Sequence, residues 1–159
     1  MSHFTDTLNP AQKEAVLNYD KPSLIVAGAG SGKTRVLTSR IAYMIEQGVH
    51  PGSILALTFT NKAANELKDR LERMLGEESR DVWAATFHSA CVRILRRDID
   101  KLGFDRSFTI YDTDDTKRLL KDILKELELD EKTFPVREIQ TIISRSKDDM
   151  ILPEEFAAQ

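Results

Sequence analysis

The sequence predicts an α/β fold in which helices flank a parallel sheet, followed by an all-helical segment. Short apolar runs suited to buried parallel strands lie at residues 23–27, 53–59 and 82–87, and a helical pattern follows each of them. Such alternation is typical of parallel strands joined by right-handed crossovers. After Gly103 the alternation ends, apart from a short candidate strand at 108–112, and the remaining patterns are helical.

Caps and apolar spacing predict the helices of the α/β part. Asn9 is a suitable N-cap, and Pro10 a suitable first residue, for a short opening helix. The helix after the first strand is expected to end at Gly48 and to bury Val36, Leu37, Ile41, Met44 and Ile45. The helix after the second strand is expected to bury Ala64, Leu67, Leu71 and Leu75.

The helical segment has candidate helices at 113–130, 135–149 and 153–159. Thr113 is the expected N-cap of the first helix. Its expected apolar face consists of Leu119, Leu120, Ile123, Leu124 and Leu127. The change of pattern near residues 105–115 places a domain boundary, which we set between 110 and 111. The two expected domains are therefore residues 1–110 and 111–159.

Length and composition are those of an ordinary globular domain. The chain has 159 residues, 41% hydrophobic and 31% charged, so we expect one domain, or one domain and part of another. The formal net charge of −3 gives no overall attraction to nucleic acid. Any binding of nucleic acid therefore has to rest on a local surface.

The single cysteine, Cys91, excludes an internal disulfide and is interpreted as a small core residue. No apolar run approaches the ~20 residues needed to span a bilayer. The first residues also lack the charged-then-apolar order of a signal peptide. These observations predict a cytoplasmic protein without a membrane partner.

A phosphate-binding loop is predicted between the first strand and the next helix. Gly32, Lys33 and Thr34 fit the end of the Walker A consensus, although Ala27 occupies its first glycine position. Glycines at 28, 30 and 32 allow positive φ angles, which turn backbone N–H groups toward an anion. The following helix N-terminus favours the same anion. The loop thus predicts a nucleoside triphosphate site, with Lys33 on the distal phosphates and Thr34 as a Mg²⁺ ligand.

Four stretches occur in an order and spacing that identify a family. They are LNPAQKEAV at 8–16, AGAGSGKTR at 27–35, LALTFTNKAANELKDRL at 55–71 and ATFHSACVRILRR at 85–97. Together they resemble the N-terminal motor domain of the superfamily 1 DNA helicases of the UvrD, Rep and PcrA type. The resemblance implies a RecA-like P-loop NTPase fold for the first motor domain, residues 1–110. Residues 111–159 resemble, more weakly, the opening helices of the inserted accessory domain of this family.

The resemblance implies an ATP site with Mg²⁺. In the family, the glutamine of the NPAQ stretch, here Gln12, reads the adenine edge, and the arginine after the loop, here Arg35, packs on the base. Lys33 and Thr34 are the expected catalytic residues. The expected nucleotide-binding residues are Gln12, Ala27, Gly28, Ala29, Gly30, Ser31, Gly32, Lys33, Thr34 and Arg35.

The resemblance also implies a single-stranded DNA surface at the carboxyl ends of the second and third strands, where parallel sheets present ligands. Phe59 is expected to stack on a base, and Asn61 and Lys62 to contact sugar or phosphate. The expected DNA-binding residues are Thr58, Phe59, Asn61, Lys62, Thr86, Phe87 and His88. Without the resemblance, Phe59 would be interpreted as a core residue and His88 as a structural or capping residue.

Charged residues outside these motifs have ordinary interpretations. The basic helix face of Arg93, Arg96 and Arg97 is interpreted as solvated charge with partners such as Asp98 or Asp100. The acidic stretches 112–115 and 146–149 do not follow an apolar strand and are interpreted as helix caps. Hydrolysis of ATP needs an acidic residue behind Mg²⁺ and a stabilising arginine. Because neither has a counterpart here, the chain is expected to be an N-terminal fragment that is inactive alone.

The full-length parent is expected to be an ATP-dependent DNA helicase. By resemblance, it moves 3′ to 5′ on single-stranded DNA, unwinds duplexes and acts at DNA junctions in repair or replication. Two alternatives stay open. One is a helicase–nuclease subunit of recombination repair, which a nuclease domain further along the parent gene would identify. The other is a P-loop binding domain that does not hydrolyse ATP, which the lack of an Asp-Glu motif would equally explain.

Overall fold

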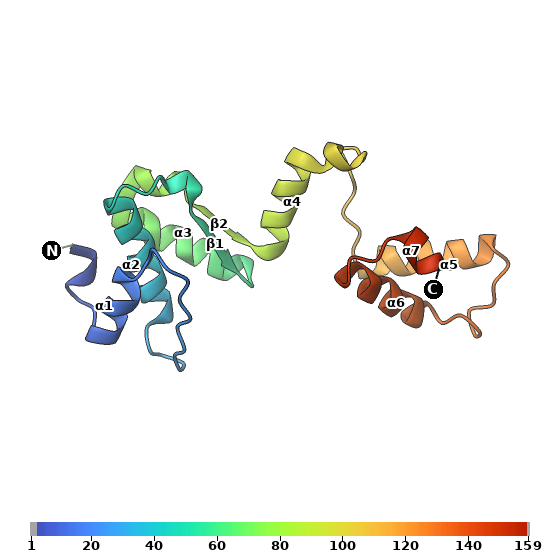
Figure 1. Cartoon of the computed structure of the whole chain (residues 1–159), viewed down its shortest axis with the longest axis horizontal. Helices are drawn as coiled ribbons and strands as arrows, with labels where there is room; N and C mark the ends of the chain where they lie inside the picture. The colour runs from blue at the N-terminus through green and yellow to red at the C-terminus, as the bar shows by residue number, and fades with distance from the viewer. Residues whose placement is uncertain (1–2, 159) are drawn as a thin grey trace. The chain divides into compact units, whose positions relative to one another are not determined.

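The computed structural model describes residues 3–158, and its tertiary contacts divide the chain into a first unit ending at Arg106 and a second unit beginning at Ser107. The first unit contains η1 His3–Thr5, α1 Pro10–Leu17, α2 Lys33–Glu46, η2 Pro51–Ser53, β1 Leu55–Thr58, α3 Asn61–Leu75, η3 Gly76–Asp81, β2 Trp83–Thr86, α4 Phe87–Asp98 and η4 Ile99–Leu102 (Figure 1). The second contains α5 Thr113–Glu126, α6 Val136–Asp148 and α7 Pro153–Ala157. The assignment of these parts as motor and accessory domains stays a prediction.

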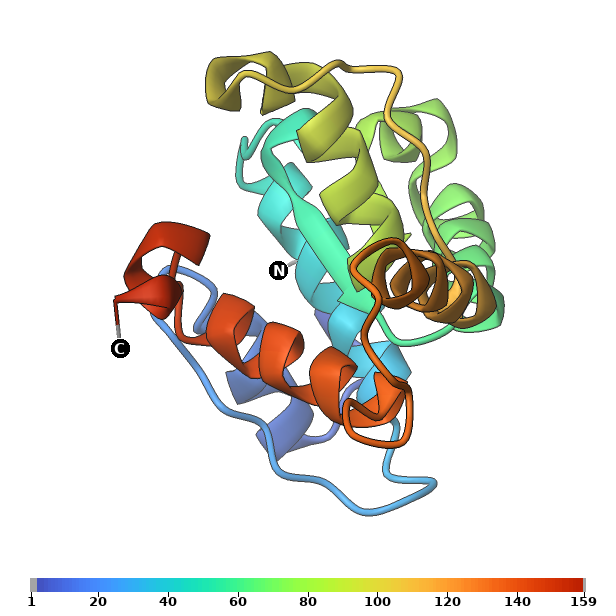
Figure 2. The ribbon, with the colours of Figure 1, turned by 90° about the vertical axis from the view of Figure 1, so that its right-hand side faces the viewer.

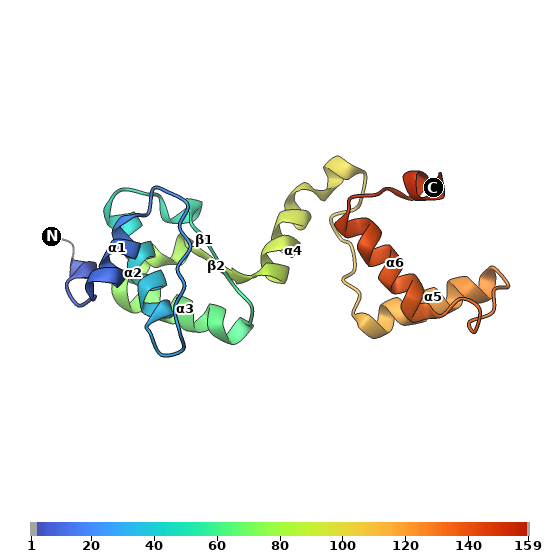
Figure 3. The same ribbon diagram turned by 60° about the horizontal axis from the view of Figure 1, so that its bottom comes forward.

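A parallel pair of strands organises the first unit. β1 and β2 pair with Leu55 opposite Trp83 and Thr58 opposite Thr86. The chain returns between them through α3, which lies beside both strands (Figure 3). A parallel pair requires a crossover of this kind. The predicted strands at 53–59 and 82–87, and their parallel direction, are therefore confirmed.

The core of the first unit lies where α2 and α3 meet this sheet. Its buried members are Ile41, Ile54, Ala56, Leu67, Leu71, Val82 and Ala84. Leu67 and Leu71, each 1% exposed, are among the largest fully buried side chains. Together with buried Ala64, they confirm the predicted inner face of α3.

The segment 23–27 does not form the predicted strand. It is extended chain outside any helix or strand, drawn as a coil in Figure 2. Leu24 is 90% exposed and Val26 88% exposed, whereas a central strand would bury both. A strand exists only where a neighbour pairs with its N–H and C=O groups, and within residues 3–158 the sheet consists of β1 and β2 alone. The candidate strand at 108–112 is not formed either, since these residues belong to no helix or strand.

The first two helices begin and end as predicted. Asn9 Oδ1 accepts a hydrogen bond from Gln12 N at 2.9 Å, Gln12 Oε1 accepts one from Asn9 N at 3.1 Å, and Pro10 is the first residue of α1. Gly48, just after α2, has a φ of +91°, a left-handed conformation that favours glycine.

The buried faces of α2 and α4 differ in part from the prediction. Val36 and Ile41 are buried as expected, but Leu37 is 37% exposed, because Thr38 and Ser39 take the buried side of that turn. Cys91 on α4 is exposed, so its interpretation as a core residue is wrong. The helix turns Ala90 inward instead. In residues 3–158, no helix has the length and apolar character that crossing a membrane would require.

The second unit has a small core of its own between α5 and α6. Leu120, Leu124 and Val136 are buried there, and Ile139 packs against them. The prediction for the apolar face of α5 is therefore confirmed for Leu120 and Leu124, which are buried, and wrong for the residues on either side of them. Leu119, Ile123 and Leu127 remain 38–61% exposed, since two helices alone cannot cover so broad a stripe.

Asp112, and not Thr113, is the N-cap of α5. Asp112 Oδ1 accepts hydrogen bonds from Asp114 N and Asp115 N, both at 2.8 Å, while Asp115 Oδ2 accepts from Asp112 N at 3.2 Å. These backbone donors stabilise the carboxylate and lower the pKa of Asp112. The capping interpretation of 112–115 is confirmed. For 146–149 it holds at the other end of a helix, because Asp149 is the C-cap residue of α6 and its backbone N–H donates to Arg145 O.

Replacing Asp112 with alanine is expected to lower the folded-to-unfolded ratio of the second unit roughly fivefold, because two N–H groups lose their acceptor. Asp112→Asn, which keeps an acceptor without the charge, should retain most of this stability. Since folding depresses the pKa, the charged contribution is present above the ordinary value of about 4 and is lost as the pH falls through the folded pKa. Urea unfolding followed by circular dichroism from pH 7 to pH 3 measures both effects. An identical pH dependence in Asp112→Asn would contradict them.

Candidate functional site

The predicted phosphate loop is a tight turn that leads directly into α2. Gly30 and Gly32 have φ angles of +75° and +88°, as their role predicts. Gly28 does not have a positive φ. Its carbonyl oxygen instead accepts from Ser31 N at 3.4 Å, Ser31 Oγ at 2.7 Å and Lys33 Nζ at 2.6 Å. The turn is therefore held by donors that converge on one carbonyl.

The N-terminus of α2 has no side-chain cap. Gly32 is its N-cap residue and offers no oxygen to the first-turn amides. A Cβ placed at Gly28 or Gly30 would meet nothing within 4 Å, so the approach to the loop is open there. Uncapped amides of a 14-residue helix behind an open, glycine-lined turn fit an anionic phosphate group.

Lys33 turns its side chain back into the loop. Its Nζ donates to the carbonyl oxygens of Ala27 at 3.0 Å and Gly28 at 2.6 Å. The ammonium charge is thus held at the turn, while Lys33 remains exposed to solvent. Both partners are neutral, and a phosphate oxygen is the stronger acceptor for a cation. Thr34 and Arg35, the next two residues, are exposed.

Gln12 connects α1 to the loop. Its Nε2 donates to Ser31 O at 3.0 Å, while its Oε1 completes the cap of α1. A Cβ at Gly32 would lie 2.8 Å from this Nε2, so a larger residue there would displace the end of the Gln12 side chain as well as strain the φ of +88°. The sequence assigned Gln12 to the nucleotide but did not reveal that Asn9 and Ser31 hold it at both ends.

The two predicted aromatic DNA contacts lie together at the carboxyl ends of the strands. Phe59 follows β1, Phe87 follows β2, and their ring centroids are 5.4 Å apart with planes tilted by 40°. Phe59 is 91% exposed and Phe87 46% exposed. The alternative interpretation of Phe59 as a core residue is therefore wrong. The pair presents aromatic surface to solvent.

The polar residues after β1 serve the turn into α3. Thr58 Oγ1 donates to Thr60 O at 3.1 Å, and Thr60 Oγ1 accepts from Ala63 N at 3.1 Å, which caps α3. Asn61 and Lys62, in the first helical turn, are exposed beside Phe59 in the sequence. Their side chains are thus available at the same edge as the aromatic pair.

Thr86 is placed differently from its neighbours. It is 8% exposed, and its Oγ1 accepts from Ser89 N at 3.2 Å and lies 2.8 Å from Ser89 Oγ. Its hydroxyl therefore caps α4. His88 is exposed in that first turn, so its alternative interpretation as the cap is wrong. Of the expected DNA contacts after β2, Phe87 and His88 reach the surface.

Of the basic face of α4, Arg97 has one of the carboxylate partners that the sequence suggests, Asp98. Arg97 Nε and Lys101 Nζ each lie 2.6 Å from an oxygen of Asp98, and these two cations lower the pKa of Asp98. Arg106, after the helix, forms the ion pair with Asp100 at 2.8 Å. The structure adds one contact that the sequence did not predict: the Arg93 guanidinium lies 4.7 Å from the centroid of the Trp83 ring.

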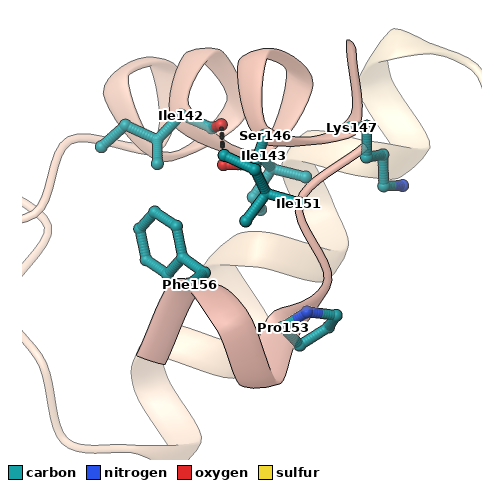
Figure 4. A pocket seen from close by; sticks show the side chains of 7 residues that line it. All are labelled: Ile142, Ile143, Ser146, Lys147, Ile151, Pro153 and Phe156. Carbon is teal, nitrogen blue, oxygen red and sulfur yellow. Dashed lines mark hydrogen bonds between the residues drawn. The ribbon is translucent and has the colours of Figure 1, made fainter. Parts of the chain in front are cut away.

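A pocket in the second unit has different chemistry. It has a volume of about 250 Å³ and is lined by Ile142, Ile143, Ser146, Lys147, Ile151, Pro153 and Phe156 (Figure 4). Ser146 Oγ donates to Ile142 O at 3.0 Å, so its hydroxyl hydrogen is already used. This apolar pocket does not resemble a phosphate site.

Similarity to known proteins extends over nearly the whole chain. Residues 8–159 match the model of the UvrD/REP helicase N-terminal domain. The chain is 58% identical over 151 residues to the ATP-dependent DNA helicase PcrA of Bacillus subtilis (strain 168), covering 94% of this chain and 20% of that protein.

Two further relatives are the proteins of the same name from Staphylococcus epidermidis (strain RP62A) and Staphylococcus aureus (strain Mu50). The identities are 51% over 156 residues and 49% over 154 residues, covering 98% and 96% of this chain and 21% of each relative. The chain thus spans about a fifth of the length of the relatives it matches. Because the family model covers nearly all of its residues, the chain belongs to the UvrD/REP helicase N-terminal domain family.

Proposed function

We propose that this chain is the ATP-binding part of an ATP-dependent DNA helicase of the PcrA type. The whole protein would move along single-stranded DNA in the 3′ to 5′ direction and unwind duplexes at DNA junctions during repair or replication in the cytoplasm. The names of its relatives support the general activity. The direction and biological role rest on the family resemblance.

The nucleotide half of the proposal rests on the loop. Amides of the first turn of α2 would receive the phosphates, Lys33 would neutralise the distal ones, and Gln12 would address adenine. Thr34 Oγ1 would bind Mg²⁺. Within residues 3–158 no three His, Cys, Asp or Glu side chains gather around a possible metal position. Mg²⁺ commonly takes few protein ligands and completes its shell with phosphate oxygens and water, so one threonine hydroxyl is compatible with it.

The exposed pair of Phe59 and Phe87 is the observation that carries the DNA half of the proposal. Phe59 is 91% exposed at the carboxyl edge of the sheet, which is where parallel sheets present their ligands. Aromatic faces stack on bases of any sequence, as movement along a strand requires. Asn61 and Lys62 would contact the sugar–phosphate backbone beside them.

Turnover needs a Mg²⁺-directed carboxylate and a stabilising arginine in addition to the loop. The acidic stretch 112–115 caps α5 in the second unit, and 146–149 ends α6. We therefore propose that the isolated chain binds ATP without hydrolysing it. The Mg²⁺-directed carboxylate and the arginines would come from the remainder of the whole protein.

Phe59→Ala is expected to weaken binding of a fluorescein-labelled oligo(dT) roughly 5- to 100-fold, because base–aromatic stacking contributes ~1–3 kcal/mol per base. The melting temperature should change little, since the ring is 91% exposed. Fluorescence anisotropy at low salt and a thermal melt on the same samples measure the two effects. Affinity should also fall steeply with added salt as phosphate contacts release counterions.

Phe104→Ala is the matched control, because Phe104 is also an exposed aromatic residue of the first unit, at 63%, but lies after η4 and not at the carboxyl edge. Its affinity for DNA should remain that of the parent chain. If Phe59→Ala bound oligo(dT) as tightly as Phe104→Ala did, the DNA surface would have to lie elsewhere.

A further inference from the structure

The peptide group between Ser31 and Gly32 joins the glycine-rich turn to α2, and a side chain of α1 lies against it. Gln12 Nε2 donates to Ser31 O at 3.0 Å, although the two residues are 19 positions apart in the sequence. A Cβ at Gly32 would lie 2.8 Å from the same Nε2 and 4.0 Å from Gln12 Cδ. The Gln12 amide is thus in close contact with the backbone of the loop, which a contact with adenine alone does not require.

The Ser31–Gly32 peptide group has two possible orientations. Gly32 has a φ of +88°, and a flip of the peptide plane would bring this angle to about −90°, which glycine adopts as readily. In a trans peptide the C=O and N–H bonds point in opposite directions. A flip would therefore exchange the sides to which Ser31 O and Gly32 N–H point. The hydrogen bond from Gln12 holds the orientation in which Gly32 N–H points away from Gln12.

Gly32 N–H is an unused donor in this orientation. Within residues 3–158 it has no hydrogen-bond acceptor, and the hydrogen bonds of α2 begin with Val36 N, which donates to Gly32 O at 3.0 Å. It therefore adds to the unpaired amides of the first turn of α2, which follow it directly in the sequence. Successive backbone N–H groups can bind the oxygens of one anion. The orientation of this peptide group thus affects how many donors the loop offers to a phosphate.

The Gln12 amide has one favourable orientation, because backbone groups hold both of its ends. Its Oε1 accepts from Asn9 N at 3.1 Å, while its Nε2 donates to Ser31 O. Turning the amide over would place two oxygens together at Ser31 and two N–H groups together at Asn9. Each end keeps one free position, since the amide nitrogen has two hydrogens and the oxygen has two lone pairs. The same side chain can therefore hold the loop and contact adenine.

We propose that Gln12 is a positioning residue for phosphate binding, in addition to its contact with the base. By holding Ser31 O, its side chain keeps Gly32 N–H among the donors that face a phosphate. This role rests on the proposed function, since it requires a loop that receives phosphates. A ligand that has phosphates but no base therefore also depends on Gln12.

Inorganic tripolyphosphate tests this role, because it has a chain of three phosphates and no base. Isothermal titration calorimetry of the 159-residue chain, with Mg²⁺, is expected to show roughly 2- to 10-fold weaker binding in Gln12→Ala and in Gln12→Glu, as the loss of one hydrogen bond predicts. Gln12→Glu keeps an acceptor for Asn9 N, and Gln12→Ala adds no charge. A loss that both variants share therefore reflects the missing donor to Ser31 O.

The amide resonance of Gly32 provides a readout that a general loss of stability would not move. In nitrogen–proton NMR spectra of the parent chain, tripolyphosphate should shift this resonance, because its N–H donates to a phosphate oxygen. In Gln12→Ala the shift should be much smaller, since the peptide group is free to flip. An equal shift in both chains would contradict the proposed role of Gln12.

Asn18→Ala is the control variant, because Asn18 also uses a carboxamide to connect α1 to the segment before the loop. Its Nδ2 donates to Ser23 Oγ at 3.2 Å, away from Ser31. It should bind tripolyphosphate like the parent chain. Equal weakening by Asn18→Ala, or binding by Gln12→Ala as tight as that of the parent chain, would overturn the proposal. A parent chain that does not bind tripolyphosphate would instead overturn the proposed function of the loop, and this role with it.

Discussion

Replacing Lys33 with alanine is expected to weaken ATP binding roughly 10- to 100-fold while leaving AMP binding nearly unchanged. A hydrogen bond from a charged donor contributes ~1.5–3 kcal/mol, and Lys33 is expected to direct its donors to the β- and γ-phosphates that AMP lacks. In the free loop the same ammonium binds the carbonyl oxygens of Ala27 and Gly28. These carbonyls lose a partner in the variant but stay exposed to water or nearly so, which limits the structural damage.

Isothermal titration calorimetry of ATP and AMP, each with Mg²⁺, measures this difference. Lys68→Ala, at an exposed position of α3, removes the same charge away from the loop and serves as the control. Equal losses of ATP and AMP affinity in Lys33→Ala would mean that Lys33 acts on the shape of the turn and not on the distal phosphates.

Leu67→Ala is expected to destabilise the first unit by ~2–5 kcal/mol. Leu67 is 1% exposed and belongs to the cluster in which α2, α3 and both strands meet, so its truncation leaves a cavity that the sheet cannot easily close. Because domains of this size have only ~5–15 kcal/mol of total stability, the folded population should fall sharply on heating.

The emission of Trp83 follows unfolding of the first unit, and circular dichroism follows both units. Leu119→Ala, on the partly exposed side of α5, is the matched leucine control and should shift the Trp83 transition very little. A loss below 1 kcal/mol in Leu67→Ala would indicate that the core relaxes around the missing side chain and is less tightly packed than its burial indicates.

Local chemistry was predictable wherever neighbouring residues alone decide the outcome. Asn9 and Pro10 begin α1, Gly48 follows α2, and Gly30 and Gly32 adopt positive φ, because each depends on a few adjacent dihedral angles and donors. The α3 face was also predictable, since its burial repeats every three or four residues.

Two failures are local, since Asp112 rather than Thr113 caps α5 and Gly28 does not adopt a positive φ. The others concern contacts with distant residues. An apolar run such as 23–27 has the composition of a buried strand, but composition does not provide the neighbour that pairs with it. The same limitation affected Cys91 and Leu37, whose burial depends on which element lies opposite.

The candidate site was predicted as a set of residues, but its internal contacts were not. The motif stretches named Gln12, Lys33 and Phe59. The bond from Gln12 to Ser31 and the ring contact between Phe59 and Phe87 both join residues far apart in the sequence. Thr86 differs from these residues. It belongs to a predicted DNA motif, but its side chain caps α4.

The caps at the carboxyl edge also have a mechanical consequence. β2 passes into α4 without an intervening residue, and β1 is separated from α3 by Phe59 and Thr60 alone, with Thr86 and Thr60 tying the first turn of each helix. These short connections leave α3 and α4 little freedom to move relative to the strands. Because α4 is 12 residues, roughly 18 Å, long, a small change in its direction at Phe87 would move Asp98 by a larger distance.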